Sequence, residues 1–360
     1  MAAPFQKLVV KVGTNVLTRD DGRLDITSIS HLVDQLAALI QQGVSVILVS
    51  SGAVGAGREL VPEADTFDPV VRRQVLASLG QVRLMELYRQ LLGGHGLLCA
   101  QVLATKGDFG DRTHYLNMRN CFEALLADPR IVPIVNENDV VSVTELMFTD
   151  NDELAGLVTG MINADALVIL SSVDGLYSGP PDDPGSHLIP EVDAADEEAL
   201  AHIAPIRSAF GRGGMATKLR MAQQTARLGA DVYLAHGRRP DILTQIAAGN
   251  FTGTRVRARR RASSVKKWLA QGVSAWKGSV HINEGALRAL RGGERVSSLL
   301  PVGVTAIDGD FGKGELVRLL APDGTVAGYG LSQYDAAEAR ENMGRQGARA
   351  LIHYDYLALV

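Results

Sequence analysis

The sequence predicts an α/β protein: a three-layer αβα sandwich around a mainly parallel sheet, followed by a small all-β domain. Up to about residue 250, short apolar runs alternate with longer amphipathic stretches, a pattern typical of a parallel sheet with helices on both faces. From Lys277 onward, short β-like runs alternate with turn signals. The length of 360 residues favours two domains.

The parallel sheet is expected to contain five short runs rich in Val, Ile or Leu, at residues 7–11, 45–50, 131–136, 166–170 and 231–235. In open α/β sheets, ligands bind beyond the carboxyl ends of the strands. The segments that follow the five strands are therefore candidates for a binding site: residues 11–15, 50–57, 136–139, 171–175 and 236–239. The first four of them carry residues suited to binding or catalysis.

A basic stretch marks the expected domain junction. Arginines and lysines crowd residues 255–267, ahead of Trp268. We interpret this stretch as a solvated linker with a short helix, and the alternative is an RNA-binding stripe beside an aromatic residue. We expect a larger domain at residues 1–255, a basic linker at 256–276 and the β domain at 277–360. Turn signals in the β domain lie at residues 308–310, 322–324 and 328–330.

The composition excludes some function classes. With 46% hydrophobic and 21% charged residues and a formal net charge of −4, the chain has no overall attraction to nucleic acid or to an anionic membrane. The sequence shows no secretion signal and no apolar run near the ~18 residues of a spanning helix, so we expect a cytoplasmic location. Cys99 and Cys121 lie in apolar surroundings without metal-ligand spacing. We expect both to be reduced core residues, and we expect no protein-held metal site.

A glycine loop at residues 211–218 ends in Lys218. Clustered glycines free backbone N–H groups to face an anion, and a trailing lysine adds a mobile positive charge, so the loop predicts phosphate binding. The loop formally fits G-x-G-x-x-G/A, but no buried strand precedes it as a dinucleotide fingerprint requires, and the chain contains no P-loop motif. The structural alternative is a flexible surface connection.

A second lysine, Lys11, lies at the end of the first predicted strand, just before the glycine turn at Gly13. Two lysines could clamp one transferring phosphoryl group. After the second strand, the hydroxyls and glycines of residues 50–57 suit a small anionic substrate, or alternatively pack helix on strand. After the third, the polar side chains of residues 136–139 favour recognition of a substrate amine. The acidic residues 150–153 open a helix, so some of them must cap it.

Together these segments resemble the amino-acid kinase family over nearly the whole chain. The matching motifs are V-V-K-V-G-T at 9–14, S-S-G-A-V at 50–54, I-V-P-I-V-N-E-N-D at 131–139, D-N-D at 150–152, V-D-G-L-Y at 173–177 and G-G-M-A-T-K at 213–218. The third motif is similar to that of the branch that phosphorylates glutamate. The resemblance implies ATP-dependent phosphorylation of the L-glutamate side-chain carboxylate, the first step of proline biosynthesis, with Mg²⁺ carried by the nucleotide. A related amino-acid or N-acetylamino-acid kinase is the alternative within this family.

The resemblance also implies roles for individual residues. The residues implied to hold glutamate are Ser51, Asp139 and Asn151. Those implied to contact ATP are Lys11, Ser171, Ser172, Arg212, Gly213, Gly214, Met215, Ala216, Thr217 and Lys218. Lys11 and Lys218 would lie over the transferring phosphoryl group, and Asp152 would orient them. Feedback inhibition by proline and a homo-oligomer are further expectations from the family. At residues 171–172, Ser-Ser stands where many members of the family carry Thr-Asp. This difference bears on which nucleotide the protein prefers.

The C-terminal segment resembles a PUA domain, a module frequent in RNA-modifying enzymes. The resemblance rests on residues 285–286, 298–303 and 312–315. It raises the alternative of an RNA-binding protein with a non-catalytic kinase-like half, but the sequence shows no interleaved aromatics for base stacking. A regulatory or assembly role is equally open.

Overall fold

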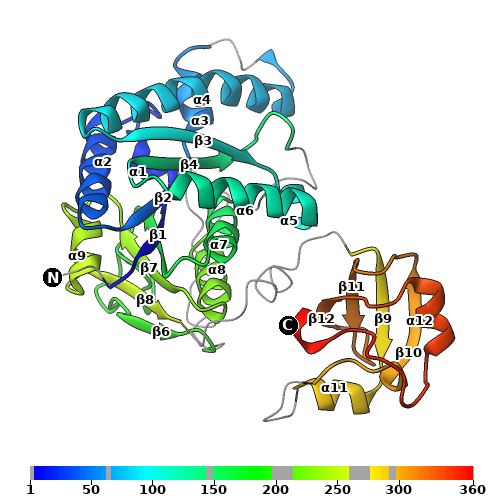
Figure 1. The fold of residues 1–360 in the computed structure, drawn as a ribbon. Coiled ribbons are helices and arrows are strands. Elements are labelled where there is room, and N and C mark those ends of the chain that lie inside the picture. Colours follow the sequence, from blue (N-terminus) through cyan, green and yellow to red (C-terminus); the bar gives the residue numbers. More distant parts are fainter. Residues whose placement is uncertain are drawn as a thin grey trace. The chain divides into compact units, whose positions relative to one another are not determined.

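The computed structural model describes residues 4–61, 66–142, 148, 150–196, 214–258, 276–291 and 297–359. Clustering of the chain gives two compact units, residues 1–108 with 112–261, and residues 262–360 with 109–111. Figure 1 shows the first unit in blue to yellow-green and the second, apart from residues 109–111, in yellow to red. Each unit has its own sheet and hydrophobic core.

Within the described residues, the first unit is built on an eight-stranded sheet of order β3-β4-β2-β1-β5-β7-β8-β6. The strands are β1 (Lys7–Val12), β2 (Ser45–Ser50), β3 (Leu98–Ala104), β4 (Ile131–Glu137), β5 (Ala166–Ser171), β6 (Glu191–Asp193), β7 (Asp231–His236) and β8 (Gly253–Arg257). All neighbours pair in parallel except β7 and β8, which are antiparallel. The mainly parallel sheet predicted from the sequence is thus confirmed.

The five predicted strands are present, each within one residue of its expected end. Three further strands, β3, β6 and β8, were not predicted. The strand β3 lies at an edge of the sheet, and only its last residue is buried while the others are exposed or half-buried, so it lacks the continuous apolar run of a central strand. The strand β8 carries two arginines in five residues, and β6 is only three residues long.

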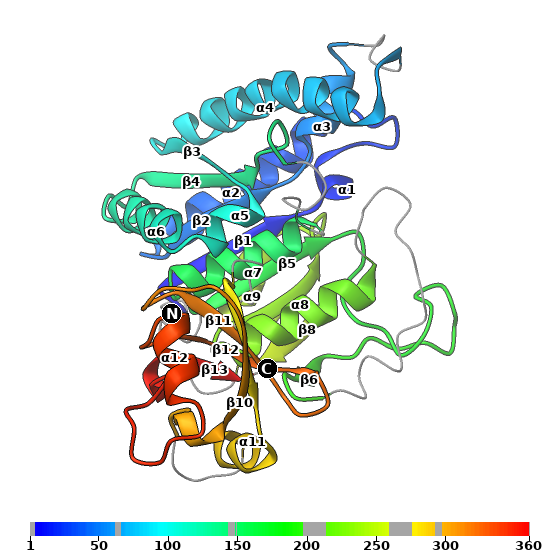
Figure 2. The same ribbon diagram turned by 90° about the vertical axis from the view of Figure 1, so that its right-hand side faces the viewer.

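Helices cover both faces of this sheet, which confirms the three-layer arrangement. The helices of the first unit are α1 (Thr14–Leu17), α2 (Ile26–Gln41), α3 (Ala53–Arg58), α4 (Pro69–Gly94), α5 (Lys106–Gly110), α6 (Arg112–Leu126), α7 (Asn151–Met161), α8 (Met215–Arg227) and α9 (Ile242–Ala248). Residues of α2, α4 and α9 form one core with β1, β2 and β5, while α6, α7 and α8 lie in front of the sheet in Figure 2. Leu8, Val10 and Val12 of β1 belong to the first face, so Lys11 points to the face of α7.

The second unit contains a five-stranded sheet of order β10-β9-β11-β12-β13 within its described residues. The strands are β9 (Gly278–Ile282), β10 (Val304–Gly309), β11 (Leu316–Leu320), β12 (Val326–Leu331) and β13 (Leu357–Leu359), with the helices α11 (Glu284–Arg291) and α12 (Ala336–Asn342). Two predicted turns are present, with left-handed glycines at Gly309 and Gly324. The third was wrong, because residues 328–330 lie inside β12, where a Cβ at Gly328 would come within 2.3 Å of a β13 carbonyl.

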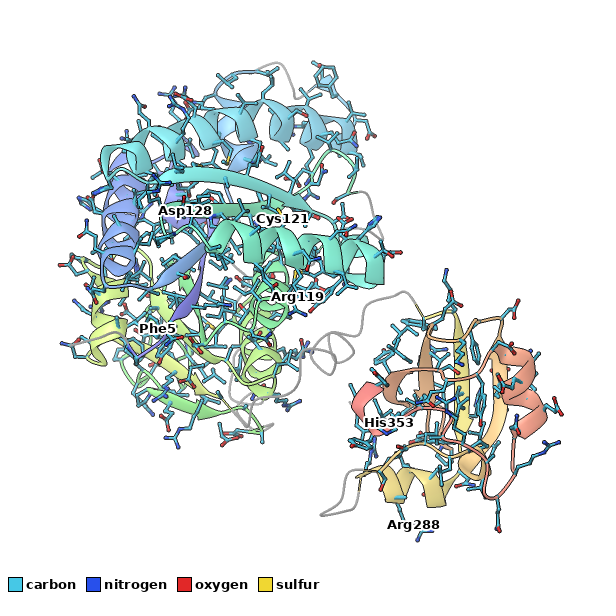
Figure 3. All side chains as sticks on the ribbon, in the orientation of Figure 1. Phe5, Arg119, Cys121, Asp128, Arg288 and His353 are labelled. Atoms are coloured by element: carbon cyan, nitrogen blue, oxygen red, sulfur yellow. The ribbon has the colours of Figure 1, made fainter. Side chains whose placement is uncertain are left out.

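Two other expectations meet the structure here. Cys99 is half-buried and Cys121 is exposed on α6 (Figure 3), so the prediction that both are core residues was wrong. Both are free thiols. Of the expected basic linker, residues 259–275 lie outside the described part of the chain, and β8 extends to Arg257. No helix among the described residues is long and apolar enough to cross a membrane.

Candidate functional site

Two lysines from distant parts of the sequence converge on one aspartate. Lys11 Nζ lies 2.6 Å from Asp152 Oδ1, and Lys218 Nζ donates a 2.5 Å hydrogen bond to Asp152 Oδ2. The Asp152 side chain is fully buried and that of Lys11 is nearly so, while Lys218 keeps 17% exposure. The structure therefore brings together the three residues to which the family resemblance assigns a catalytic role.

The helix start of α7 fixes Asp152. Asp150 is the N-cap, and its Oδ1 accepts hydrogen bonds from the backbone N–H groups of Asp152 and Glu153 at 3.0 and 3.1 Å. Part of the acidic cluster does cap the helix, as its position predicts. The second oxygen of the cap, Asp150 Oδ2, is buried and has no hydrogen-bond partner among the described residues.

The charges of this centre depend on one another. Burial raises the pKa of Asp152, but attraction by Lys11 and Lys218 outweighs burial and lowers that pKa to about 2. Burial lowers the pKa of Lys11 below that of an ordinary lysine, and Asp152 opposes this shift only in part. The pKa of Asp150 is raised by burial and by repulsion from Asp152. Asp152 is therefore an anion at neutral pH.

Close packing of α8 on α7 positions Lys218. A Cβ at Gly156 of α7 would lie 2.8 Å from Thr225 Oγ1 and 3.5 Å from Met221 Cε of α8. Gly214 is the N-cap of α8 and makes no side-chain hydrogen bond. The first N–H groups of a helix have no partner within it and attract anions. Half-buried Met215, Ala216 and Thr217 form this first turn, whereas Arg212 and Gly213 lie outside the described residues.

A polar network adjoins the lysine centre on the other side of the start of α7. Asn151 Nδ2 lies 3.0 Å from three acceptors, which are Ser50 O, Ser51 Oγ and Asn136 Oδ1. Asn136 in turn donates to Gln81 Oε1 of α4 at 2.9 Å. Consecutive residues thus serve the two halves of the site, because Asn151 faces the network and Asp152 faces the lysines.

Asp139 joins this network through an arginine that the sequence analysis missed. Arg73 Nη2 donates to Glu137 Oε2 at 2.8 Å and also to Asp139 Oδ1. The backbone N–H of Glu137 bonds to Asn136 Oδ1 at 2.9 Å. The three residues expected to hold glutamate therefore belong to one connected set of polar groups. No motif surrounds Arg73 in the sequence, so only the fold reveals its position.

Two glycines allow α4 to bring Arg73 and Gln81 to the site. A Cβ at Gly80 of α4 would lie 1.8 Å from Ala53 O, and a Cβ at Gly57 of α3 would lie 2.0 Å from Leu76 O. The helices α3 and α4 therefore touch backbone to backbone. Gly57 therefore packs one helix against another. The sequence analysis had considered two other roles for the glycines of residues 50–57, an anion site and the packing of a helix on a strand.

The expected nucleotide side lies at the ends of β5 and β1. Ser171 ends β5 and its hydroxyl donates to Val173 O at 3.1 Å, while Ser172 is exposed. The Gly13 N–H donates to Leu170 O at 3.1 Å, which ties the turn after β1 to β5. Among the described residues, no group of three or more His, Cys, Asp or Glu side chains is arranged to hold a metal ion.

Comparison with known proteins assigns most of the chain to two known families. A model of the amino acid kinase family matches residues 6–236, and a PUA domain model matches residues 278–354. The "Glutamate 5-kinase" of Chlorobaculum tepidum is 50% identical over 356 residues, covering 99% of this chain and 98% of the relative. That of Bacteroides thetaiotaomicron is 45% identical over 360 residues, covering 99% of both chains.

A solved structure supports the fold alone. The carbamate kinase from Giardia lamblia bound to AMP-PNP superposes with a TM-score of 0.53 at 17% identity, covering 71% of this chain and 99% of that one. The chain belongs to the amino acid kinase family and carries a PUA domain after its kinase region.

Proposed function

We propose that the protein transfers the γ-phosphoryl group of ATP to the side-chain carboxylate of L-glutamate, giving L-glutamyl 5-phosphate for proline biosynthesis. Full-length relatives at 45–50% identity carry the name of this activity. The observation that carries the proposal is the pair of lysines on Asp152. An RNA-binding protein with an inactive kinase-like half is not favoured, because this charged centre is intact.

The chemistry needs no general base. The acceptor carboxylate, with a reference pKa of about 4.3, is already ionised at neutral pH. One of its oxygens forms a bond to the γ-phosphorus while the bond between that phosphorus and the bridging oxygen of ADP breaks. Lys11 and Lys218 would offset the charge of two anions that approach one another, and Asp152 would hold both ammonium groups in place.

Glutamate would bind at the polar network of Ser51, Asn151 and Asp139. Amide and hydroxyl groups suit its α-carboxylate, and carboxylate oxygens suit its ammonium group. Arg73 sets the direction of the Asp139 carboxylate. Asp150 Oδ2, which has no hydrogen-bond partner in the described part of the chain, would be a further buried acceptor for a cationic group that a ligand brings.

ATP would lie between the ends of β1 and β5 and the start of α8. The proposed contacts are Lys11, Ser171, Ser172 and the loop from Arg212 to Lys218. Magnesium would arrive with the nucleotide, held mainly by phosphate oxygens and water. The buried Oδ2 of Asp150, which has no hydrogen-bond partner among the described residues, would be an acceptor for such an ion. When bound, magnesium would neutralise phosphate charge.

Several wider expectations belong to this proposal. The family resemblance supports a cytoplasmic homo-oligomer that proline inhibits. Residues 1–255 would form the catalytic domain, residues 256–276 a linker and residues 277–360 the PUA-like domain. The formal net charge of −4 gives the chain no overall attraction to RNA, so charge does not support RNA binding by that domain.

The test is ADP release by the purified full chain with MgATP and one acceptor at a time. The acceptors are L-glutamate, L-aspartate, N-acetyl-L-glutamate and none, with hydroxylamine present to trap an acyl phosphate. Glutamate-dependent hydroxamate is the expected result. Activity with another acceptor alone would keep the kinase and overturn the substrate. Inactivity with all of them would overturn the function.

A further inference from the structure

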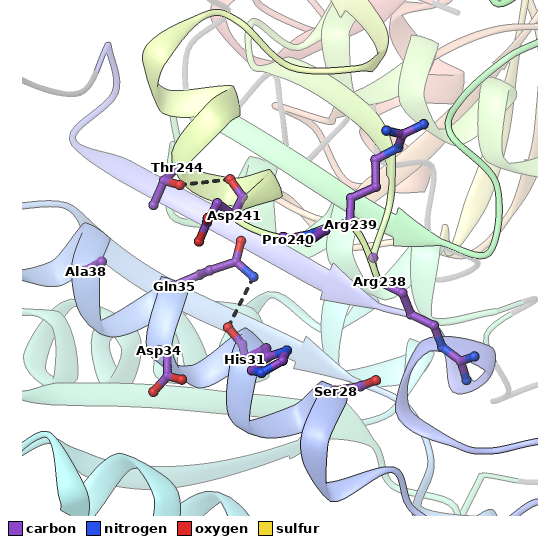
Figure 4. Close-up of a pocket in the computed structure, with 11 residues that line it drawn as sticks. Ser28, His31, Asp34, Gln35, Ala38, Arg238, Arg239, Pro240, Asp241 and Thr244 are labelled. Carbon is purple, nitrogen blue, oxygen red and sulfur yellow. Dashed lines mark hydrogen bonds between the residues drawn. The ribbon is translucent and has the colours of Figure 1, made fainter.

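The turn after β7 lies at the end of the fifth predicted strand. The sequence analysis assigned no binding or catalytic role to this strand end. It consists of Gly237, Arg238 and Arg239, and it adjoins a cavity of about 290 Å³ lined by α2 and the start of α9. Figure 4 shows the two guanidinium groups pointing away from each other, Arg238 toward the turn after β1 and Arg239 away from it. Tandem arginines that diverge in this way can hold two separate segments.

Gly237 packs the turn against both neighbouring strand ends. Its N–H donates to Ser171 O at 2.9 Å. A Cβ at this position would lie 2.7 Å from Val16 Cγ1 and 3.1 Å from Leu170 Cβ. The glycine therefore allows α1, which follows β1, to lie directly on the turn that follows β7, across the end of β5.

Arg238 fixes the short helix α1. Its Nη2 donates to Asn15 O at 3.1 Å and to Thr18 O at 2.6 Å. These carbonyls belong to the end of a four-residue helix, where a cation is favourable because the carbonyls lack helical partners. The helix begins directly after Gly13 and so continues the segment that carries Lys11.

Arg239 fixes the loop after β5. Its Nε and Nη2 bond to the two carboxylate oxygens of Asp174 at 2.5 and 2.8 Å. This bidentate pair holds the pKa of Asp174 below its usual range. Asp174 lies two residues after Ser172, so the pair sets the course of the loop that starts at the proposed nucleotide contacts.

We propose that Arg238 and Arg239 are positioning residues for ATP: Arg238 holds the phosphate-side segment after β1, and Arg239 holds the nucleotide-side loop after β5. This inference rests on the proposed function for the roles of those two segments. Neither arginine needs to touch the substrate, because each acts through the backbone or side chain that it holds. Loss of either one should let its segment shift and weaken ATP binding or misalign the phosphates.

The decisive variant is Arg239→Ala, measured with the purified full chain. We expect the KM for ATP to rise about tenfold while the KM for glutamate changes less than twofold. Calorimetric binding of adenylyl imidodiphosphate without an acceptor should weaken by a similar factor. Because that binding involves no acceptor, it tests the inference even if glutamate is the wrong substrate. Asp174→Ala should reproduce the loss, and the double variant should be no worse than the single ones.

A matched control separates positioning from stability. Arg255 Nη2 pairs with Asp231 Oδ2 at 2.7 Å at the opposite end of β7, and the Arg255 side chain is 39% exposed against 43% for Arg239. Arg255→Ala should leave the KM for ATP unchanged. Arg239→Lys, which keeps the charge but loses the fork, should give a smaller rise than Arg239→Ala and decides the matter if the alanine variant does not fold.

The second arginine has its own readout. Arg238→Ala should lower kcat about tenfold, because α1 continues the segment of Lys11, and Arg238→Lys should recover part of the loss. An Arg239→Ala enzyme with an unchanged KM for ATP, or with equal increases for ATP and glutamate, would overturn the inference. So would a control variant, Arg255→Ala, that loses ATP affinity as much as Arg239→Ala.

Discussion

The two halves of the candidate site handle charge in opposite ways. At the half proposed for phosphoryl transfer (the phosphoryl half), two lysines share the single carboxylate of Asp152. At the half proposed to bind glutamate (the glutamate half), one arginine, Arg73, lies between the carboxylates of Glu137 and Asp139. The first arrangement holds positive charge ready for phosphate, and the second holds negative charge that suits an ammonium group. The start of α7 separates them, since Asn151 and Asp152 are adjacent residues that face different halves.

Under the proposed function, each half is prepared for a ligand of the opposite sign. A buried charge without compensation is costly. Each half limits that cost by pairing opposite charges. Each half also keeps one charged group that is only partly compensated, and the ligand would complete the compensation. Changes in the phosphoryl half should therefore affect turnover, whereas changes in the glutamate half should affect affinity for glutamate.

The largest effect is expected from Lys218→Ala. This change removes a positive charge that would matter most as the phosphoryl group moves, so kcat should fall by about 10²–10³-fold while the KM for glutamate changes little. Steady-state kinetics over both substrates measures this split. Lys106→Ala is the control. Lys106 pairs at 2.7 Å with Glu153, which lies next to Asp152 on α7, but Lys106 does not contact Asp152. An unaltered kcat in Lys218→Ala would show that the lysine centre is not the phosphoryl half.

The next largest effect is expected from Asp139→Ala. Loss of this carboxylate should raise the KM for glutamate by about 10–100-fold and change kcat much less, because a ground-state contact is lost and Arg73 loses its ion pair with Asp139. Asp128→Ala, which removes an exposed ion pair with Arg130 on the surface, is the control. A normal KM for glutamate would place the substrate ammonium elsewhere.

A smaller effect tests how the glutamate half is held. Gly80→Ala would press a methyl group into the α3 backbone. We therefore expect a loss of about 1–3 kcal/mol in the free energy of unfolding. We also expect a higher KM for glutamate, because α4 carries Arg73. Gly93 lies in the same helix with nothing within 4 Å of an added Cβ. Gly93→Ala should be neutral or stabilise by up to about 1 kcal/mol. Denaturant unfolding of both variants makes the comparison, and equal stabilities would show that the close contact is not required.

Sequence reasoning predicted the candidate site from strand ends but could not assemble all of it. Lys11 and Asp139 follow or end apolar runs, and parallel strands bring such ends to one edge. Arg73 lies on the long helix α4, more than 60 positions from Asp139, and its place depends on a backbone contact at Gly80 that has no periodic signal. The strand β3 was missed for a similar reason, because its edge position leaves Leu98 52% exposed and removes the continuous apolar pattern.

The smallest effect is expected on the acid side of the pH profile. The pKa of Asp152 is lowered to about 2, below its unfolded value of about 3.9. Its contribution to stability is therefore complete above that unfolded value and is lost only as the pH falls toward about 2. Between pH 5 and 8, kcat should show no titration from Asp152. On the alkaline side, kcat should fall at a lower pH than an ordinary lysine predicts, because burial lowers the pKa of Lys11.

Activity at saturating substrates from pH 5 to 10, at constant ionic strength, measures both limbs. A titration in kcat between pH 5 and 8 that persists in Asp150→Asn would contradict a fully compensated Asp152. The pKa of Asp150 is raised by burial and by Asp152, and asparagine keeps the cap while removing the charge. If the titration disappears in Asp150→Asn, the cap rather than the lysine centre limits activity in acid, and the phosphoryl half is charged as the structure indicates.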